Sequence, residues 1–412
     1  MTEYFPGRRG KLAGVAVALL IMSVLPGAVS STTGGVKITT VSAGSTPTGI
    51  AVDLATGNVY AVAQGYGNLS VISGSTNKWD QNISCWAISP TDVAIDSNTS
   101  NAFVTDSEQG NVSIISTTSG LITRNVTVGL DPTGIDVDPA TGNVYAVVTG
   151  ENAIVVFNQA TGAVIANVSA DPFPLYRGGG SSMAVAVDSS TGYAYVANYL
   201  DSDVAVISQS FSVVGTIGVG QGPSAIAVNP STNMVYVVDS TDNNVTVINA
   251  NSNSIVANIT DIGLGTDAIA VDPVNNLVYV ANGGTNTVSV ISGLTNTVVQ
   301  NITVGNDPDA IAVNTNTGAV YVANNVDNTM SVITGVSVTT STSSSTSSSS
   351  VTSSPTTTSS SSTSSTSTKT SSSIPEFPLG AVGAALVALV VASTYVLARR
   401  RTAARDGLTK SV

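Results

Sequence analysis

The side chains of this chain that could do chemistry are almost all carboxylates, amides and hydroxyls. The sequence of 412 residues contains no histidine and one cysteine, Cys85. Zinc sites built from Cys and His, catalytic triads that need His and an intrachain disulfide are therefore excluded. For Cys85 we expect the role of a small buried apolar side chain. We predict no catalytic residue and no cofactor, and we expect that the protein is not an enzyme.

Carboxylates gather in segments that should lie on one face of the fold described below. They are Asp106, Glu108, Asp131, Glu151, Asp201, Asp203, Asp239, Asp242, Asp267, Asp307, Asp309 and Asp327. Oxygen-only ligands suit Ca²⁺, for which the candidate ligands are Asp201, Asp203, Asp239, Asp242, Asp307 and Asp309. No stretch has the spacing of a known calcium-binding loop, and Asp is an ordinary turn residue. Ca²⁺ binding and plain turn structure both stay open.

The sequence also offers acceptors for N-linked glycans. Nine N-x-S/T motifs fall in the repeat region, at Asn68, Asn82, Asn98, Asn111, Asn125, Asn167, Asn244, Asn258 and Asn301. Such motifs are acceptors in an exported chain. Four of them fall in expected outermost strands: Asn125, Asn167, Asn258 and Asn301. Asn and Thr are abundant here, so some matches arise by chance. We predict that several of the motifs are glycosylated.

The charge of the folded part differs from that of nucleic-acid-binding proteins. The net charge is −12, and only 9% of residues are charged. Between Val36 and Ile333 the basic residues are Lys37, Lys78, Arg124 and Arg177. Because phosphates need a positive footprint, we expect no nucleic-acid partner. The acidic balance suits divalent cations or a high-salt or acidic medium, or it simply keeps the surface soluble.

A unit of three short apolar runs recurs along the chain and is clearest at Ala310–Ile333. The runs are rich in Val, Ile and Tyr and are separated by Asn, Asp, Thr and Gly, which is typical of consecutive antiparallel strands. The first run ends, at spacings of roughly 43, 42, 50, 41, 43 and 42 residues, in Asp53, Asp96, Asp138, Asp188, Asn229, Asp272 and Asn314. A period in the low forties indicates a β-propeller with one blade per repeat.

Each repeat has side chains at fixed positions. The innermost strands are predicted at Gly49–Val52, Val93–Ile95, Ile135–Val137, Ala184–Val187, Ala225–Val228, Ala268–Val271 and Ala310–Val313. The second strand carries one aromatic ring, expected to pack between blades: Tyr60, Phe103, Tyr145, Tyr195, Tyr236, Tyr279 and Tyr321. The Asp or Asn that ends the innermost strand should accept backbone N–H bonds across the next turn rather than act as a catalytic acid.

The last repeat lacks an outermost strand, because the composition changes to Ser and Thr after Ile333. Val36–Ala43, ahead of the first full repeat, resembles the segments that precede later innermost strands. We predict that it pairs beside Met330–Ile333. This pairing would close an all-β ring of seven four-stranded blades over residues 36–334.

One repeat carries an insertion, Ala170–Ser182, which produces the spacing of 50 residues. Its Phe173, Tyr176 and Arg177 are candidates for contacting a sugar or protein partner. An alternative of equal weight is a loop that plugs the axial channel. The two tryptophans, Trp79 and Trp86, are expected to pack against the blades.

Several segments resemble the YVTN-type β-propeller repeat. They are TGNVYAV at 56–62 and 141–147, AYVAN at 194–198, and VYVAN at 278–282 and 320–324. That family is known from cell-surface proteins of archaea and from some bacterial exported proteins. The resemblance covers about residues 36–334 and implies the propeller fold, but it implies no defined activity.

The two ends of the chain predict export and anchoring. Residues 1–30 have the basic start and apolar run of a signal peptide, with a short leader at 31–35, and a retained N-terminal anchor is the alternative. Residues 335–373 are almost wholly Ser and Thr, and form either an O-glycosylated stalk or an unmodified linker. Residues 374–398, which begin with the motif PEFP, predict a transmembrane helix, and 399–412 a basic cytoplasmic tail. This combination also resembles archaeal sorting signals whose span is replaced by a lipid.

We therefore expect a single-pass cell-surface protein with an extracellular propeller and a structural or adhesive role. Its partners would be the membrane, through the C-terminal helix, and other envelope proteins or polysaccharide. The alternative is an extracellular module that binds a ligand or Ca²⁺. A lactonase-like or quinoprotein-like enzyme is less favoured, because it would need acid–base or metal chemistry from carboxylates alone.

Overall fold

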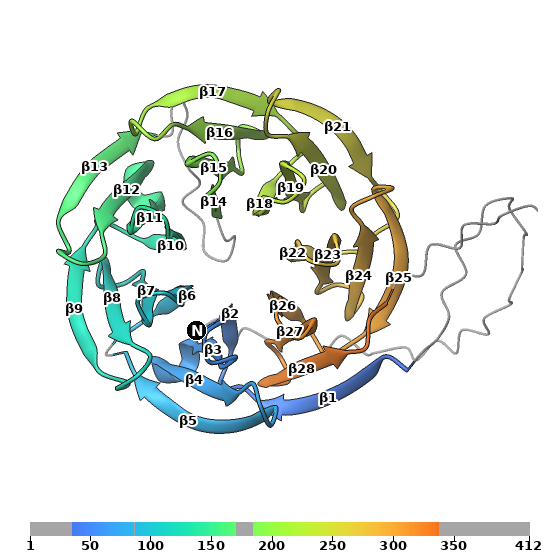
Figure 1. Cartoon of the computed structure of the whole chain (residues 1–412), viewed down its shortest axis with the longest axis horizontal. Coiled ribbons are helices and arrows are strands. Elements are labelled where there is room, and N and C mark those ends of the chain that lie inside the picture. The colour runs from blue at the N-terminus through green and yellow to red at the C-terminus, as the bar shows by residue number, and fades with distance from the viewer. Residues whose placement is uncertain (1–34, 86, 170–183, 338–412) are drawn as a thin grey trace, which may run out of the picture. The chain divides into compact units, whose positions relative to one another are not determined.

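The computed structural model describes residues 35–85, 87–169 and 184–337. They form seven four-stranded sheets around one axis, so the predicted seven-bladed β-propeller is confirmed (Figure 1). Outside the described residues lie the insertion Ala170–Ser182 and four segments that were predicted from the sequence: the signal peptide, the stalk beyond residue 337, the membrane helix 374–398 and the tail 399–412. No helix within the described ranges is long and apolar enough to span a bilayer.

Each blade runs from the axis to the rim in chain order. The innermost strands are β2 (Pro47–Val52), β6 (Pro90–Asp96), β10 (Pro132–Asp138), β14 (Val185–Asp188), β18 (Pro223–Asn229), β22 (Thr266–Asp272) and β26 (Pro308–Asn314). The second strands are β3 (Val59–Ala63), β7 (Asn101–Asp106), β11 (Asn143–Val148), β15 (Tyr193–Asn198), β19 (Met234–Asp239), β23 (Leu277–Asn282) and β27 (Ala319–Asn324). The third strands are β4 (Asn68–Ser73), β8 (Asn111–Ser116), β12 (Ala153–Asn158), β16 (Asp203–Ile207), β20 (Asn244–Asn249), β24 (Thr287–Ser292) and β28 (Thr329–Thr334). The outermost strands are β5 (Lys78–Ser84), β9 (Ile122–Thr127), β13 (Val164–Ser169), β17 (Val213–Gly218), β21 (Ser254–Ile259), β25 (Thr297–Thr303) and β1 (Lys37–Ser42).

The ring closes as predicted. β1 is the outermost strand of the blade that begins with β26, and it pairs antiparallel with β28. The register is unbroken, with Thr39 opposite Val332. Because the first strand of the chain completes the last blade, the two ends of the propeller are held together and no third strand is left with a free edge.

The core of the propeller lies between neighbouring blades. All seven ring residues of the second strands are at most 2% exposed, which confirms their predicted packing role. Phe103 packs edge-to-face against Phe157 of the next blade, with ring centroids 6.4 Å apart. Phe103 also belongs to one hydrophobic cluster with Val144 and Ala146 of that next blade. Each sheet therefore buries both of its faces against its neighbours.

The turn role of the Asp and Asn residues is also confirmed. Asp53 Oδ1 accepts the backbone N–H of Ala55 at 3.0 Å, and its Oδ2 accepts the Thr56 hydroxyl at 2.8 Å. The same pattern recurs at Asp96, Asp138 and Asp188, and at Asp272 the amide of Asn275 takes the place of the Thr hydroxyl. The backbone contact recurs at Asn229 and Asn314. These buried side chains shape the turn between the first two strands of each blade.

Of the two packing predictions for Cys85 and Trp79, the structure confirms the first and contradicts the second. Cys85 is fully buried, as expected, and its thiol donates to the Gly67 carbonyl oxygen at 3.1 Å. The packing role predicted for Trp79 is wrong, because this side chain is 49% exposed on β5. β5 is an outermost strand whose one buried residue is Ile83, and a bulge separates Trp79 from the regular pairing of Ile83 with Leu69. Trp86 lies outside the described residues.

Removal of β1 should open the ring. A chain that begins at Ala43 loses the strand that covers β28, and we expect its Tm to fall by about 10 °C or more. The freed edge should also promote self-association, because it presents unpaired backbone groups. Calorimetry and light scattering measure the two effects. A chain that begins at Gly35 is the matched control, and equal Tm values for both chains would contradict closure by β1.

Two ring tyrosines form a second test. Tyr321 Oη donates to Asn77 Oδ1 at 3.0 Å, whereas Tyr236 Oη is buried with no partner in the part of the chain that the structure describes. We expect Tyr321→Phe to cost about 1 kcal/mol of unfolding free energy, and Tyr236→Phe to be neutral or stabilising. Denaturant unfolding of both variants measures the difference. An equal loss for the two would show that the hydroxyl environments do not differ as described.

Candidate functional site

Two sets of loops share one face of the propeller, as the sequence predicted. One set joins the second and third strands of each blade, at 64–67, 107–110, 149–152, 199–202, 240–243, 283–286 and 325–328. It includes the short 3-10 helices η1 (Gln64–Tyr66) and η2 (Thr149–Glu151). The other set leads into the innermost strands, at 43–46, 87–89, 128–131, 219–222, 260–265 and 304–307. We call this the mouth face.

Backbone hydrogen bonds tie the two sets of loops together. Gly150 N donates to Leu130 O at 3.0 Å, and equivalent bonds occur at most other blades. Buried side chains at the end of the second strand add further ties. Asp106, for example, accepts the backbone N–H groups of Ile88 and Ser89 at 2.9 and 3.2 Å. The mouth face is therefore a firmly held surface.

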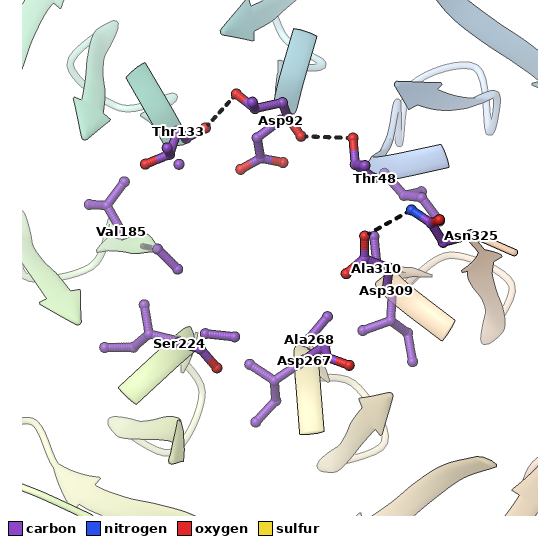
Figure 2. A pocket seen from close by; sticks show the side chains of 18 of the residues that line it. Thr48, Asp92, Thr133, Val185, Ser224, Asp267, Ala268, Asp309, Ala310 and Asn325 are labelled. Carbon is purple, nitrogen blue, oxygen red and sulfur yellow. Dashed lines mark hydrogen bonds between the residues drawn. The ribbon is translucent and has the colours of Figure 1, made fainter. Parts of the chain in front are cut away.

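A cavity of about 420 Å³ lies where the axial channel meets the mouth face (Figure 2). Its wall includes one residue near the start of each of six innermost strands: Thr48, Thr91, Thr133, Ser224, Asp267 and Asp309. Below them lie aliphatic side chains, among them Ile50, Ile226 and Ile311. Gln64 and Asn325, from loops of the mouth face, also line the cavity. Equivalent positions thus converge because the innermost strands surround the axis.

On one side of the cavity the hydroxyl groups of the threonines form hydrogen bonds with backbone carbonyl oxygens of the protein. Thr48 Oγ1 donates to Thr91 O at 3.1 Å, and Thr91 Oγ1 lies 3.2 Å from Thr133 O. These bonds cross from blade to blade around the axis. On the other side, Ser224 is 6% exposed and its Oγ has no partner among the described residues.

Asp92 and Asp136 join neighbouring innermost strands. Asp92 accepts the N–H of Val93 at 2.8 Å and that of Ile135, in the next blade, at 3.3 Å. Asp136 likewise accepts from Val137 and from Val187 of the following blade, both at 2.8 Å. Loss of solvation on burial raises the pKa of Asp92 to about 6 and that of Asp136 to about 7. For the Asp136 pKa, repulsion by Asp92 and Asp138 adds to this rise.

Asp267 and Asp309 line the cavity together with Asp92, whereas Asp136 is not among the lining residues. Burial, followed by repulsion from Asp309 and Asp307, raises the pKa of Asp267 to about 7. Burial and the charge of Asp307 raise the pKa of Asp309 to about 6, although Asn325 Nδ2 donates to this carboxylate at 3.3 Å. None of the described residues that line the cavity is a lysine or arginine. The arrangement can accept a proton or a positively charged group, but these residues offer no cationic partner of their own.

The six candidates for Ca²⁺ ligands are spread over different blades. Asp239 is buried and accepts the Thr246 hydroxyl at 2.6 Å, and Asp203 accepts Asn198 Nδ2 at 2.7 Å. Asp242 accepts the N–H of Gln221 at 2.8 Å. Asp307 and Asp309 lie together near the cavity, and Asp201 lies in a loop of the mouth face. Within the described ranges, no three His, Cys, Asp or Glu side chains are grouped so that they could hold a metal ion.

The asparagines of the predicted glycosylation sites differ in solvent exposure. Asn244 is 7% exposed, and Asn68 and Asn111 are half-buried at the starts of third strands. The remaining sequons are exposed: Asn82, Asn98, Asn125, Asn167, Asn258 and Asn301. Phe173, Tyr176 and Arg177 lie outside the described residues.

Sequence reasoning missed Asp92 and Asp136. A signal was present, because most equivalent positions in the other repeats hold glycine or alanine. An aspartate that departs from a small-residue consensus in a buried strand must satisfy its charge locally. The sequence did not show that Asp92 and Asp136 bridge neighbouring blades, because the bridging depends on the distance between adjacent innermost strands.

Four carboxyls with raised pKa values, those of Asp92, Asp136, Asp267 and Asp309, make the stability of the fold depend on pH. Each folded-state pKa lies above the ordinary value of 3.8, at about 6 or about 7, so the folded protein binds protons more tightly than the unfolded chain. Tighter proton binding stabilises the folded state at low pH, and this stabilisation is lost as the pH rises through these pKa values. We therefore expect a higher Tm at about pH 5 than at about pH 8. The double variant Asp267→Asn, Asp309→Asn should show a smaller difference, and Asp80→Asn is the control. An unchanged difference in the double variant would contradict this assignment.

Comparisons with known proteins support the fold. No protein-family model matches the chain, and no curated protein matches it. Among solved structures, hydrazine synthase from Kuenenia stuttgartiensis is similar over 71% of this chain and 96% of its own, with a TM-score of 0.62 and 16% identity. Virginiamycin B lyase from Staphylococcus aureus is similar over 73% of this chain and 100% of its own, with a TM-score of 0.61 and 15% identity. The resemblance to the YVTN-type repeat stays a prediction, and what these likenesses show is a seven-bladed β-propeller.

Proposed function

We propose that this propeller is displayed at the cell surface and has an adhesive or structural role, in which its mouth face binds a basic protein of the envelope. Export and anchoring rest on the predicted signal peptide, stalk and C-terminal membrane helix. These segments lie outside the described residues, so the proposal for them depends on the sequence alone.

The distribution of exposed charge carries the proposal. Eight carboxylate side chains are exposed in the described part of the chain, and seven of them lie on the mouth face: Glu108, Asp131, Glu151, Asp242, Asp261, Asp307 and Asp327. The eighth, Asp80, lies on β5. The basic residues of the described part lie elsewhere, on the outermost strands: Lys37, Lys78 and Arg124. One face therefore presents negative charge that no described basic side chain on that face offsets.

The same face also exposes large apolar side chains. They are Tyr66, Ile88, Leu130, Leu200, Leu264 and Val326, each more than half exposed. Apolar groups mixed with charges of one sign are typical of a surface that meets a complementary partner. The opposite face also exposes apolar residues, such as Val274 and Leu294, but no exposed carboxylate of the described ranges lies there. Charge, rather than apolar area, distinguishes the mouth face.

We favour binding over catalysis because of what surrounds the cavity carboxylates. Asp92 accepts the backbone N–H groups of Val93 and of Ile135 in the next blade, and Asp309 accepts a hydrogen bond from the amide of Asn325. A hydrolytic or redox site would need a positioned nucleophile, metal or cationic group beside them. The two similar solved proteins are named as enzymes, but at 15% and 16% identity their activities do not transfer to this chain.

Retention of envelope proteins on the immobilised chain tests the proposal. We expect basic envelope proteins to be retained at low salt and released as the ionic strength rises, because exposed charges are screened. The triple variant Glu108→Gln, Asp131→Asn, Asp261→Asn should retain at least about fivefold less. Among the described residues these three side chains have no hydrogen-bond partner that the substitutions would remove.

Asp80→Asn is the matched control, since it removes an exposed carboxylate away from the mouth face. Equal retention by the triple variant and the control, or retention that does not respond to salt, would contradict the proposal. Retention that appears only with added Ca²⁺ would replace it with the calcium-binding alternative. Turnover of a lactone or ester by the wild-type chain would replace it with an enzyme.

A further inference from the structure

The rim of the propeller is made of strand edges that carry little charge. Every outermost strand pairs on one side only, with the third strand of its blade (Figure 1). Four consecutive outermost strands contain no charged residue: β13, β17, β21 and β25. Instead they expose branched apolar side chains, such as Ile165, Val214 and Ile255, each about half exposed. Uncharged apolar edges of this kind invite pairing with another strand.

Soluble β proteins normally protect such edges with lysines, prolines or bulges. Here a bulge interrupts the pairing of the outermost strand in six blades. A bulge disturbs the edge at one point, but most of the strand keeps its free backbone groups. These four strands contain no lysine or proline, so a different device is needed.

Five sequons occupy one equivalent position on the rim, and we call them the rim sequons. In the ladder with the third strand, their asparagines stand opposite equivalent residues: Asn82 opposite Ser70, Asn125 opposite Ser113, Asn167 opposite Val155, Asn258 opposite Thr246 and Asn301 opposite Ser289. Each asparagine is exposed, the Ile or Val after it is buried, and the Ser or Thr two residues on is exposed. In the other two blades this position holds Thr216 and Thr40.

The rim sequons present their amide nitrogens to solvent. Three of the asparagines accept a hydroxyl bond from the serine opposite: Asn82 from Ser70 (3.0 Å), Asn125 from Ser113 (2.9 Å) and Asn301 from Ser289 (2.8 Å). In each case the acceptor is Oδ1, and Nδ2 has no partner among the described residues. An N-linked sugar attaches to Nδ2 and leaves the carbonyl oxygen free to accept. The hydrogen bond and the modification are therefore compatible.

A purely structural role does not explain the whole pattern. An asparagine that only paired with a serine would not need a Ser or Thr two residues later, yet all five have one. Asn167 stands opposite Val155, which cannot supply the hydroxyl bond. The shared feature is the complete acceptor motif, and it recurs at one level of the rim.

We propose that the five rim sequons carry N-linked glycans, which form a belt that prevents the strands bearing them, among them the uncharged β13, β21 and β25, from pairing with other strands. The sugar comes from an activated glycosyl phosphate. Its anomeric carbon–oxygen bond to phosphate breaks, the bond from that carbon to Asn Nδ2 forms, and the amide nitrogen loses a proton while the phosphate leaves. The proposal rests on export, which is part of the proposed function. The belt leaves the mouth face open, because it lies on the rim.

Glycopeptide mass mapping of the full chain from its native cells tests occupancy. We expect glycans at all five rim asparagines, and little at Asn244, which is buried. Cleavage of the chain by protease added to intact cells tests export separately. A chain that is cleaved at the surface but has bare rim sequons overturns the belt and leaves the proposed function standing. A chain that is not exposed at the surface overturns both.

Five hydroxyl substitutions test the protective role without removing any asparagine: Ser84→Ala, Thr127→Ala, Ser169→Ala, Thr260→Ala and Thr303→Ala. Each removes a sequon, and the Oδ1 contacts of Asn82, Asn125 and Asn301 are kept. We expect the combined variant to keep the wild-type Tm and to aggregate at least about fivefold faster on concentration. Thr40→Ala with Thr216→Ala is the matched control, because these strands have no sequon, and it should behave as the wild type. An unchanged aggregation rate in the combined variant overturns the protective role.

Discussion

The pairing of β1 with β28 is the contact on which the rest of this structure depends. Seven sheets that pack face to face would otherwise form an open array, in which the first and last sheets expose apolar faces. The single strand from the beginning of the chain completes the last blade and fixes the ring. Once the ring is closed, the innermost strands surround one axis and every loop is assigned to one of two faces.

Closure explains why the polar groups are distributed as they are. The turns of one face bury Asp and Asn residues, such as Asp53, which accept local N–H groups. The mouth face carries seven of the eight exposed carboxylates in the described part. The rim carries the described basic residues and the five rim sequons, which share one ladder position. Three surfaces with different chemistry thus arise from one repeated unit, and we assign partner binding to the mouth face.

The regular features of the fold could be predicted because each is local and repeated. Tyr60 and its counterparts, the turn at Asp53 and the sevenfold period are all visible within about 43 residues. The closing strand followed from one missing strand at the end and one extra at the beginning. The exposure of Trp79 was predicted wrongly, because it depends on which residues of β5 face the neighbouring blade.

The candidate site was less accessible from the sequence. Asp309 was among the predicted ligands, but its approach to Asp267 depends on the convergence of two blades at the axis. The bridges made by Asp92 and Asp136 depend on the same convergence. The ladder position shared by the rim sequons could have been found by aligning the repeats. Four of the five motifs precede the next innermost strand by a similar distance, and only at Asn167 does the insertion Ala170–Ser182 lengthen it.

Hydrogen exchange of the chain in its native envelope, compared with the purified chain, tests the central claim most directly. The account predicts slower exchange in envelope-bound protein at the mouth-face loops, such as 107–110, 149–152 and 325–328. The turns that follow Asp53 and Asp272, on the opposite face, should exchange equally in both samples. Protection confined to those turns, or no protection on either face, would contradict a partner-binding mouth face.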